Sequence, residues 1–316
     1  MSKFESLPSR VIVACVAIPL ILWLAMLGGY FFFLLVALIS TLALFEFYGL
    51  AERKGAAPLK FIGLVAGFLI NGVFLYERIQ IEMYQFVADK FNYHLAMFSQ
   101  HQLFSVILIK FLLITLLIEL FRRKGSPMLN IATTVLGVLV ISLCLGTLIF
   151  LRELFPYGFP VHKFFATGFA DDQQLRQIDL WGGWTIISTL VSIWLCDTAA
   201  YFVGSTLGKH HLFKSVSPNK TWEGAVAGFI FSIITMIVAK YLVLGYLSIL
   251  HAAILGILIG IFGQLGDLIE SRFKRDANVK DSSKLIPGHG GAYDRFDSLV
   301  YVSPIVYLYI DFIVLS

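Results

Sequence analysis

Long apolar runs recur from one end of the chain to the other, and they limit the possible folds more than any other feature. Runs of about 17–25 apolar residues have the length that an α-helix needs to cross a bilayer. The 316 residues are 58% hydrophobic and 15% aromatic, whereas soluble domains contain about 45–50% apolar residues. The C-terminal half is as apolar as the first half. The sequence therefore predicts an all-α, polytopic integral membrane protein.

The apolar runs divide into about nine predicted spans. They are 11–28, 30–50, 61–76, 104–121, 129–151, 183–203, 224–245, 249–269 and 298–315. A tight hairpin across Gly28 and Gly29 is expected between the first two, and another across Leu244 and Gly245 between the seventh and eighth. We expect residues 1–182 to form N-terminal transmembrane helices and surface segments, and 183–316 a C-terminal transmembrane catalytic half, in one continuous membrane domain.

The positions of the basic residues predict the orientation, because cytoplasmic loops carry an excess of Lys and Arg. With a cytoplasmic N-terminus and alternating spans, cytoplasmic segments carry 17 of the 24 Lys and Arg, and the outer segments 77–103 and 152–182 carry 5. The loops 204–223 and 271–297 then face the cytoplasm, where nucleotides are found. We expect a protein of the cell (inner) membrane.

Other features carry less information. Cys15, Cys144 and Cys196 lie in apolar runs without a pairing or metal-binding pattern, which is typical of small buried hydrophobic residues. Lys110 lies deep in the fourth span with no evident partner. Glu46 lies near a span end, where a carboxylate can reach the interface. The segment 77–103 is too polar to span, and 152–182 is expected on the membrane surface.

The stretch 271–297 is a dense polar island in a chain that is only 14% charged. It contains six cations, four aspartates and a His-Gly-Gly sequence at 289–291. Carboxylates suit Mg²⁺, which binds one or two of them together with substrate phosphates. Lys and Arg bind phosphate oxygens, and glycines let the backbone approach a ligand. A solvated basic loop would explain the lysines, but it explains the aspartates and His-Gly-Gly poorly.

The same stretch resembles the signature of the phosphatidate cytidylyltransferases, also called CDP-diacylglycerol synthases. The fixed positions of that signature are filled in order by Ser271, Lys274, Arg275, Lys280, Asp281, Ser283, Ile286, Pro287, His289, Gly290, Gly291, Asp294, Arg295 and Asp297. Ala292 is the loosest fit, since the family usually has a larger apolar residue there. The resemblance extends upstream to Asp197, over about 130 residues, whereas the first 180 resemble the family only in hydrophobicity.

A second polar loop follows the sixth predicted span. It reads Ser-Pro-Asn-Lys-Thr-Trp-Glu-Gly at 217–224 and contains no Walker sequence. Asp197 lies inside the preceding span, where an ionisable residue is a functional candidate. An ordinary capping turn is the alternative, with Ser217 or Asn219 as the helix cap and Pro218 at the first position. The resemblance implies that Asp197, Ser217, Lys220 and Glu223 lie beside the nucleotide site.

Asp267 follows a glycine-rich helix segment, Gly-Gln-Leu-Gly at 263–266. It could be a helix-end carboxylate paired with a neighbouring lysine. The resemblance instead makes Asp267 and Asp294 the pair that holds a two-cation centre, with Asp197 as a third acidic group. The expected cofactor is Mg²⁺, with a second cation that the sequence does not identify.

The resemblance implies that CTP and phosphatidate react to give CDP-diacylglycerol and pyrophosphate. It assigns catalytic roles to Lys220, Lys274, Arg275, Lys280, Asp281, His289 and Arg295. It assigns substrate binding to Ser217, Lys220, Glu223, Ser271, Gly290, Gly291 and Asp297. For His289, proton transfer, phosphate binding and a structural hydrogen bond stay open. The expected partners are CTP, phosphatidate and membrane lipid, without nucleic acid, and the family suggests a homodimer.

Two other functions fit parts of the sequence but not the whole of it. A CTP-dependent polyprenol or phytol kinase would need a base to activate a hydroxyl group, and the complete signature argues against it. A secondary transporter or channel would suit Asp197 and the glycine-broken helices. The basic and acidic loop on one side, together with the lack of an inverted repeat, argues against transport.

Overall fold

The computed structural model describes residues 7–91, 96–165, 170–283, 285 and 290–316. Most of these residues are helical. The N-terminal part contains α1 (Leu7–Leu27), α2 (Gly29–Arg53), α3 (Lys60–Phe74), α4 (Tyr76–Phe91), α5 (Gln100–Phe121), α6 (Pro127–Gly137), the π-helix η1 (Val138–Leu143), α7 (Cys144–Gly158) and α8 (Val161–Phe164). The C-terminal part contains α9 (Asp172–Leu207), β1 (His211–Phe213), β2 (Ser217–Thr221), α10 (Trp222–Leu242), α11 (Ile249–Asp276), α12 (Tyr293–Tyr309) and the π-helix η2 (Ile310–Leu315).

The membrane nature of the chain is confirmed, but the count of nine spans is not. Among the described residues, seven helices are long and apolar enough to cross a membrane, or eight if the bent pair α3 and α4 is one span. These two helices meet at 61°. The described apolar part of α1, Cys15–Leu27, is shorter than a full span. The segment 152–182 begins with the end of α7 and ends with the start of α9. Because α9 runs without a break through residues 182 and 183, the division into two parts at that point stays a prediction.

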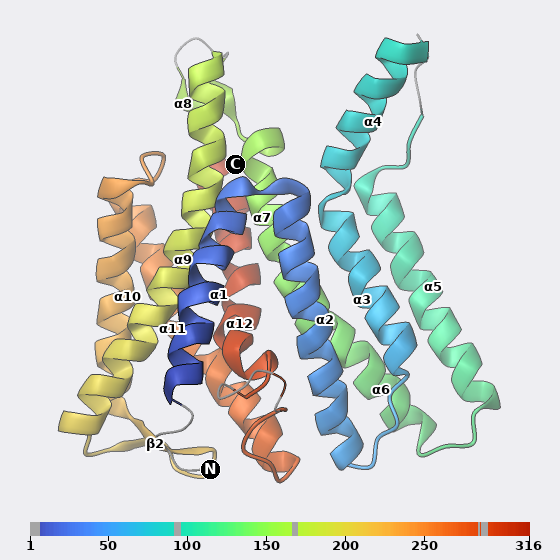
Figure 1. Ribbon diagram of the computed structural model, residues 1–316, viewed down its shortest axis with the longest axis vertical. Helices are drawn as coiled ribbons and strands as arrows, with labels where there is room; N and C mark the ends of the chain where they lie inside the picture. Colours follow the sequence, from blue (N-terminus) through green and yellow to red (C-terminus); the bar gives the residue numbers. More distant parts are fainter. Residues whose placement is uncertain (1–6, 92–95, 166–169, 284, 286–289) are drawn as a thin grey trace.

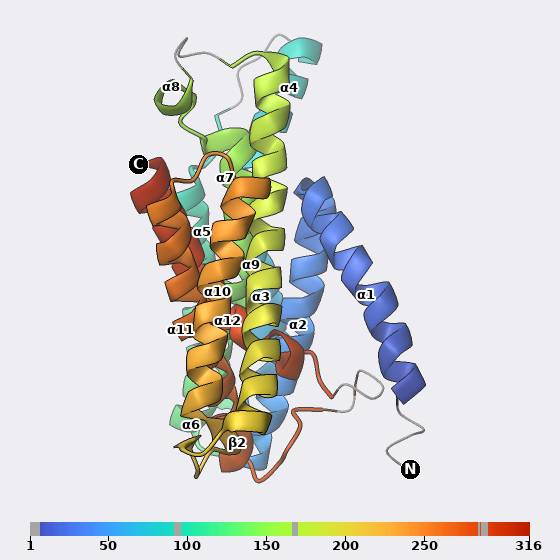
Figure 2. The ribbon, with the colours of Figure 1, turned by 90° about the vertical axis from the view of Figure 1, so that its left-hand side faces the viewer.

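The C-terminal helices form one side of the bundle. Helices α9, α10, α11 and α12 pack against one another in chain order, and α7 lies against both α9 and α12 (Figure 1). On the other side, α3 lies between α2 and α5. Helix α1 leans away from the bundle toward its N-terminal end (Figure 2). The strands β1 and β2 form a small antiparallel hairpin, which is the departure from the predicted all-α fold.

The turn between α1 and α2 is held by a buried arginine. Gly28 and Gly29 both have positive φ, as the predicted hairpin requires. Arg152 of α7 is 1% exposed; it donates to the carbonyl oxygens of Ala25 and Met26 and pairs with Asp179 of α9 at 2.8 Å. The ends of α1, α7 and α9 are thereby joined by charge-assisted bonds.

The loops predicted to be cytoplasmic gather at one end of the molecule. Four parts of the chain lie at the lower end of Figure 1: the turn between α2 and α3, the turn between α5 and α6, the hairpin β1–β2, and the described residues between α11 and α12. Helices α4 and α8 lie at the opposite end. The two loops with chemical side chains are therefore neighbours in space, although two long helices separate them in sequence.

Candidate functional site

The start of α10 is built differently from the predicted capping turn. Ser217, Pro218 and Asn219 belong to β2, and the helix cap is Thr221, whose Oγ1 accepts from the amide of Gly224 at 3.2 Å. The prediction of Ser217 or Asn219 as the cap was wrong because the strand continues through them. A Cβ on Gly224 would lie 2.5 Å from the carbonyl oxygen of Ala200, so α9 and α10 cross closely here.

A pocket of about 820 Å³ lies beside this crossing. Its walls come from α9, the hairpin, and the starts or ends of α10, α11 and α12. Its acidic, basic and histidine lining residues are Asp197, His211, Lys220, Asp267, Asp294, Arg295 and Asp297. The pocket thus brings together side chains from both predicted chemical loops and the intramembrane Asp197.

Three carboxylates form a cluster at the edge of this pocket. Asp267, Glu270 and Asp297 each offer one oxygen, and these oxygens lie within 4.8 Å of one another. Glu270 is completely buried, whereas Asp267 and Asp297 are partly exposed. Clustered carboxylate oxygens are ligands that Mg²⁺ prefers. The donor set therefore fits the expected cation, although it shares only Asp267 with the predicted set: Glu270 and Asp297 stand in the cluster, whereas Asp294 and Asp197 do not belong to it.

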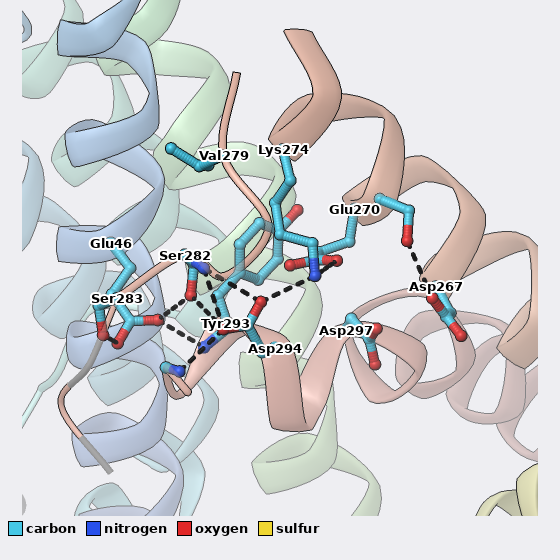
Figure 3. A network of polar contacts seen from close by, with 12 residues as sticks. Glu46, Asp267, Glu270, Lys274, Val279, Ser282, Ser283, Tyr293, Asp294 and Asp297 are labelled. Atoms are coloured by element: carbon cyan, nitrogen blue, oxygen red, sulfur yellow. Dashed lines mark hydrogen bonds and ion pairs between the residues drawn. The ribbon is translucent and has the colours of Figure 1, made fainter. Parts of the chain in front are cut away.

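Two lysines balance these charges. Lys220 of β2 places Nζ 2.5 Å from Asp267 Oδ2, and Ser271 Oγ donates to Asp267 Oδ1 at 3.2 Å. Lys274 lies between two carboxylates, 2.6 Å from Glu270 Oε2 and 2.9 Å from Asp294 Oδ1 (Figure 3). Because Lys274 is one helical turn beyond Glu270, both groups project from the same face of α11.

Asp294 lies in the first turn of α12 and is surrounded by donors. It accepts from the amide of Ser282 at 3.0 Å, the hydroxyl of Ser282 at 3.0 Å and the amide of Gly291 at 2.8 Å, besides the ammonium group of Lys274. Gly290 has φ +85°, and a Cβ there would lie 2.8 Å from Asp294 Oδ2. These bonds fix the Asp294 carboxylate at the pocket wall. Its pairing with Asp267 around a cation stays a prediction.

Other predicted site residues make contacts of a different kind. Glu223 accepts from the amides of Lys209 and His210 and from His210 Nδ1 at 2.6 Å, so it shapes the turn before β1. Arg275 donates to the carbonyl oxygens of Val216 and Val279. Its guanidinium group therefore links the end of α11 to the hairpin. Neither residue is among the described lining of the pocket.

Three further residues with predicted catalytic roles belong to the segment after α11. Lys280 and Asp281 are exposed, and His289 lies outside the described residues. Arg295 lines the pocket and Asp297 lies both in the lining and in the carboxylate cluster. The roles predicted for these residues stay predictions.

Two acidic residues at the site were missed from the sequence. Glu270 is three residues after Asp267 and four before Lys274, a spacing that puts the three side chains on one helix face and could have identified it. Glu46 was expected at the interface, but it is 4% exposed and accepts hydrogen bonds from Ser282 and Ser283. Its position inside an apolar helix was the available signal.

The chain is similar to known proteins over most of its length. A sequence model of the cytidylyltransferase family matches residues 8–313. Phosphatidate cytidylyltransferases of Staphylococcus haemolyticus and Bacillus subtilis are 48% and 40% identical over 121 and 134 residues, which are 38% and 42% of this chain. The chain spans about half the length of these two curated relatives, 46% and 50%.

Another relative is similar from end to end. The phosphatidate cytidylyltransferase of Synechocystis sp. is 32% identical over 308 residues, which are 95% of this chain and 95% of that protein. The family predicted from the residues between 197 and 297 is thereby confirmed. The match now includes the N-terminal helices, where the sequence alone offered only hydrophobicity. This chain belongs to the cytidylyltransferase family.

Proposed function

We propose that this protein is a phosphatidate cytidylyltransferase, which converts CTP and phosphatidate to CDP-diacylglycerol and pyrophosphate. The observation that carries the proposal is the pocket where Lys220, Arg295 and four aspartates line one space, two of the aspartates forming a carboxylate cluster with the buried Glu270. Two polyanionic substrates need cations to hold their phosphates and carboxylates to bind metal ions. The names of the relatives support the same reaction.

The reaction needs no nucleophilic side chain, because phosphatidate carries its own nucleophile. An oxygen of the lipid phosphate attacks the α-phosphorus of CTP, the bond from that phosphorus to the bridging oxygen of the β-phosphate breaks, and pyrophosphate leaves with the bond's electron pair. Catalysis is then positioning and electrostatic stabilisation. Lys220 and Arg295 line the pocket, where they would bind phosphate oxygens and hold the two reactants in line.

Mg²⁺ is the proposed cofactor, with a second cation of unknown identity. Asp267, Glu270 and Asp297 have the clustered oxygens to hold it, and Asp294 and Asp197 line the same pocket. When bound, the ion would neutralise charge on the phosphates. Lys274 lies between Glu270 and Asp294 and forms an ion pair with each of them. These ion pairs offset the free-energy cost of burying the two carboxylates in the helix bundle.

We also propose that the protein lies in the inner membrane with the pocket end toward the cytoplasm. The gathering of basic loops at one end supports this orientation, because CTP is cytoplasmic and basic loops stay inside. A homodimer, which the family suggests, stays a prediction that a mass measurement of the detergent-solubilised protein tests.

Purified protein in phospholipid vesicles, supplied with Mg²⁺ and CTP labelled in the α-phosphate, tests the function. Label should move into lipid as CDP-diacylglycerol, with one pyrophosphate released for each lipid labelled. Diacylglycerol is the matched control, because it lacks the attacking phosphate and should give no labelled lipid. A second assay, with CTP labelled in the terminal phosphate and with a polyprenol or phytol as acceptor, tests the alternative: label transferred to the alcohol would establish a kinase. Absence of any turnover, together with solute flux into the vesicles, would establish a transporter.

A further inference from the structure

Glu46 of α2 makes an unusual set of contacts for a carboxylate inside an apolar helix. Oε2 accepts from the hydroxyl of Ser282 at 2.8 Å and from the amide of Tyr293 at 2.8 Å. Oε1 accepts from the hydroxyl of Ser283 at 2.6 Å and from the amide of Ala292 at 2.9 Å. The carboxylate, 4% exposed, thus has four neutral donors. A buried charge with this many aligned donors is held in one position.

The four donors lie on both sides of the signature's glycine pair. Ser282 and Ser283 follow α11, whereas Ala292 and Tyr293 begin α12. One carboxylate of the N-terminal half therefore fastens the two ends of the connection between α11 and α12 (Figure 3). Ala292 makes no side-chain cap for α12, so Glu46 supplies the acceptor that the first amides of this helix need.

Gly291 confirms how closely this carboxylate approaches the backbone. A Cβ on Gly291 would overlap the Glu46 Oε2 and Ser282 Oγ atoms. Its own amide donates to Asp294 Oδ2 at 2.8 Å. Only glycine leaves room for Glu46 on one side while bonding to Asp294 on the other.

Ser282 connects Glu46 to the pocket. Its hydroxyl lies 2.8 Å from Glu46 Oε2 and 3.0 Å from Asp294 Oδ2, and its amide also donates to Asp294. A hydroxyl has one proton to donate, so these two carboxylates share a single donor. Asp294 in turn pairs with Lys274 and lines the pocket. The position of Asp294 therefore depends on where Glu46 holds Ser282.

We propose that Glu46 is a positioning residue for the cytidylyltransferase reaction: through Ser282 and the first amides of α12, it holds Asp294 and Lys274 in their working positions. It is not among the described lining residues of the 820 Å³ pocket, which come from other elements. Its kinetic consequence rests on the proposed function. Its structural consequence, an ordered junction between α11 and α12, does not.

Glu46→Gln and Glu46→Ala test this role, with Glu52→Gln as the matched control. Glu52 lies on the same helix but pairs with Lys60 at the surface. We expect kcat to fall about tenfold in Glu46→Gln and about 100-fold in Glu46→Ala, with the KM for CTP changing less than about threefold, because positioning is lost and binding is kept. Glu52→Gln should match the wild type.

Two further measurements separate positioning from stability alone. Hydrogen exchange of the amides at 292 and 293 should rise at least about tenfold in Glu46→Gln, while exchange in α9 stays unchanged. Ser282→Ala should lower kcat by itself and add little to Glu46→Ala, because both act through one contact. If Glu46 contributed only to stability, its variants would have a lower melting temperature, but the folded fraction would keep a normal kcat. The kcat effects of Glu46→Ala and Ser282→Ala would then also be independent of each other.

Normal kcat in folded Glu46→Ala, or additive effects with Ser282→Ala, overturns the proposal. If neither Glu46 variant folds, Ser283→Ala provides another test, because it removes one donor to the Glu46 carboxylate. A normal kcat for Ser283→Ala would also overturn the proposal. If the wild type makes no CDP-diacylglycerol, the proposed function fails by itself. The structural part of the proposal, in which Glu46 clamps the junction between α11 and α12, would still be tested separately. Unchanged hydrogen exchange of the amides at 292 and 293 in Glu46→Gln would overturn it.

Discussion

Lys220 of β2 lies just before α10 but does not cap that helix, since Thr221 has that place. Its ammonium group instead neutralises Asp267 at 2.5 Å, within the lining of the pocket. A lysine in this position can move between the carboxylate and a phosphate oxygen, because its flexible stem carries three donors.

Replacing Lys220 by methionine keeps the length of the side chain and removes its charge. We expect kcat to fall about 100-fold or more, the size of losing one aligned donor to the transition state. The free energy of unfolding should change by about 1 kcal/mol or less, since the ion pair is partly exposed. Lys214→Met, in the exposed turn of the same hairpin, is the control. Kinetics and thermal unfolding on both variants measure this, and an unchanged kcat for Lys220→Met removes the hairpin from the catalytic site.

The carboxylates give a test of the metal site at the same scale. Asp267→Asn should abolish synthesis while leaving a folded protein, and a direct Mn²⁺ titration should show weakened binding. Asp297→Asn and Asp294→Asn then decide which aspartate binds the cation together with Asp267: Asp297, as in the carboxylate cluster, or Asp294, as the family resemblance implies. Replacing a true ligand should weaken Mn²⁺ binding, whereas replacing a positioning group should lower turnover only. Asp276→Asn, on the exposed pair with Lys54, is the control. Near-normal turnover of Asp267→Asn in saturating Mg²⁺ would rule out the assignment.

At the scale of elements, the turn between α1 and α2 makes a prediction about stability. Gly28 has φ +65°, and a Cβ there would lie 2.7 Å from the guanidinium group of Arg152. Gly28→Ala should lower the free energy of unfolding by about 1–3 kcal/mol, the usual cost of strained backbone. Gly72→Ala is the matched control, because a Cβ at Gly72 meets nothing within 4 Å. It should be neutral or stabilising by up to about 1 kcal/mol. Equal melting temperatures for the two variants would contradict this account.

The elements also show how far the sequence could predict the site. Hydrophobic length predicted most spans, and the family resemblance singled out Asp267, Asp294 and Arg295, which line one pocket, because these signals are local. The clamp by Glu46 could not be predicted, since its partner Tyr293 lies 247 residues away and only packing of α2 against α12 brings them together. The Thr221 cap was missed because the strand before it extends farther than the local turn residues suggest.

The whole molecule has two chemically different ends, and this difference predicts its topology. Lys280 is exposed in the segment that follows α11, and Lys90 is exposed on α4. Helix α4 lies at the end opposite the hairpin β1–β2 and the other basic loops (Figure 1). In a background without Cys15, Cys144 and Cys196, we expect Lys280→Cys to react with a membrane-impermeant maleimide only after the cells are opened, because basic loops stay in the cytoplasm. Lys90→Cys, the matched variant, should react in sealed cells. Labelling of position 280 from outside would place the pocket away from cytoplasmic CTP, and both the topology and the proposed reaction would then have to be abandoned.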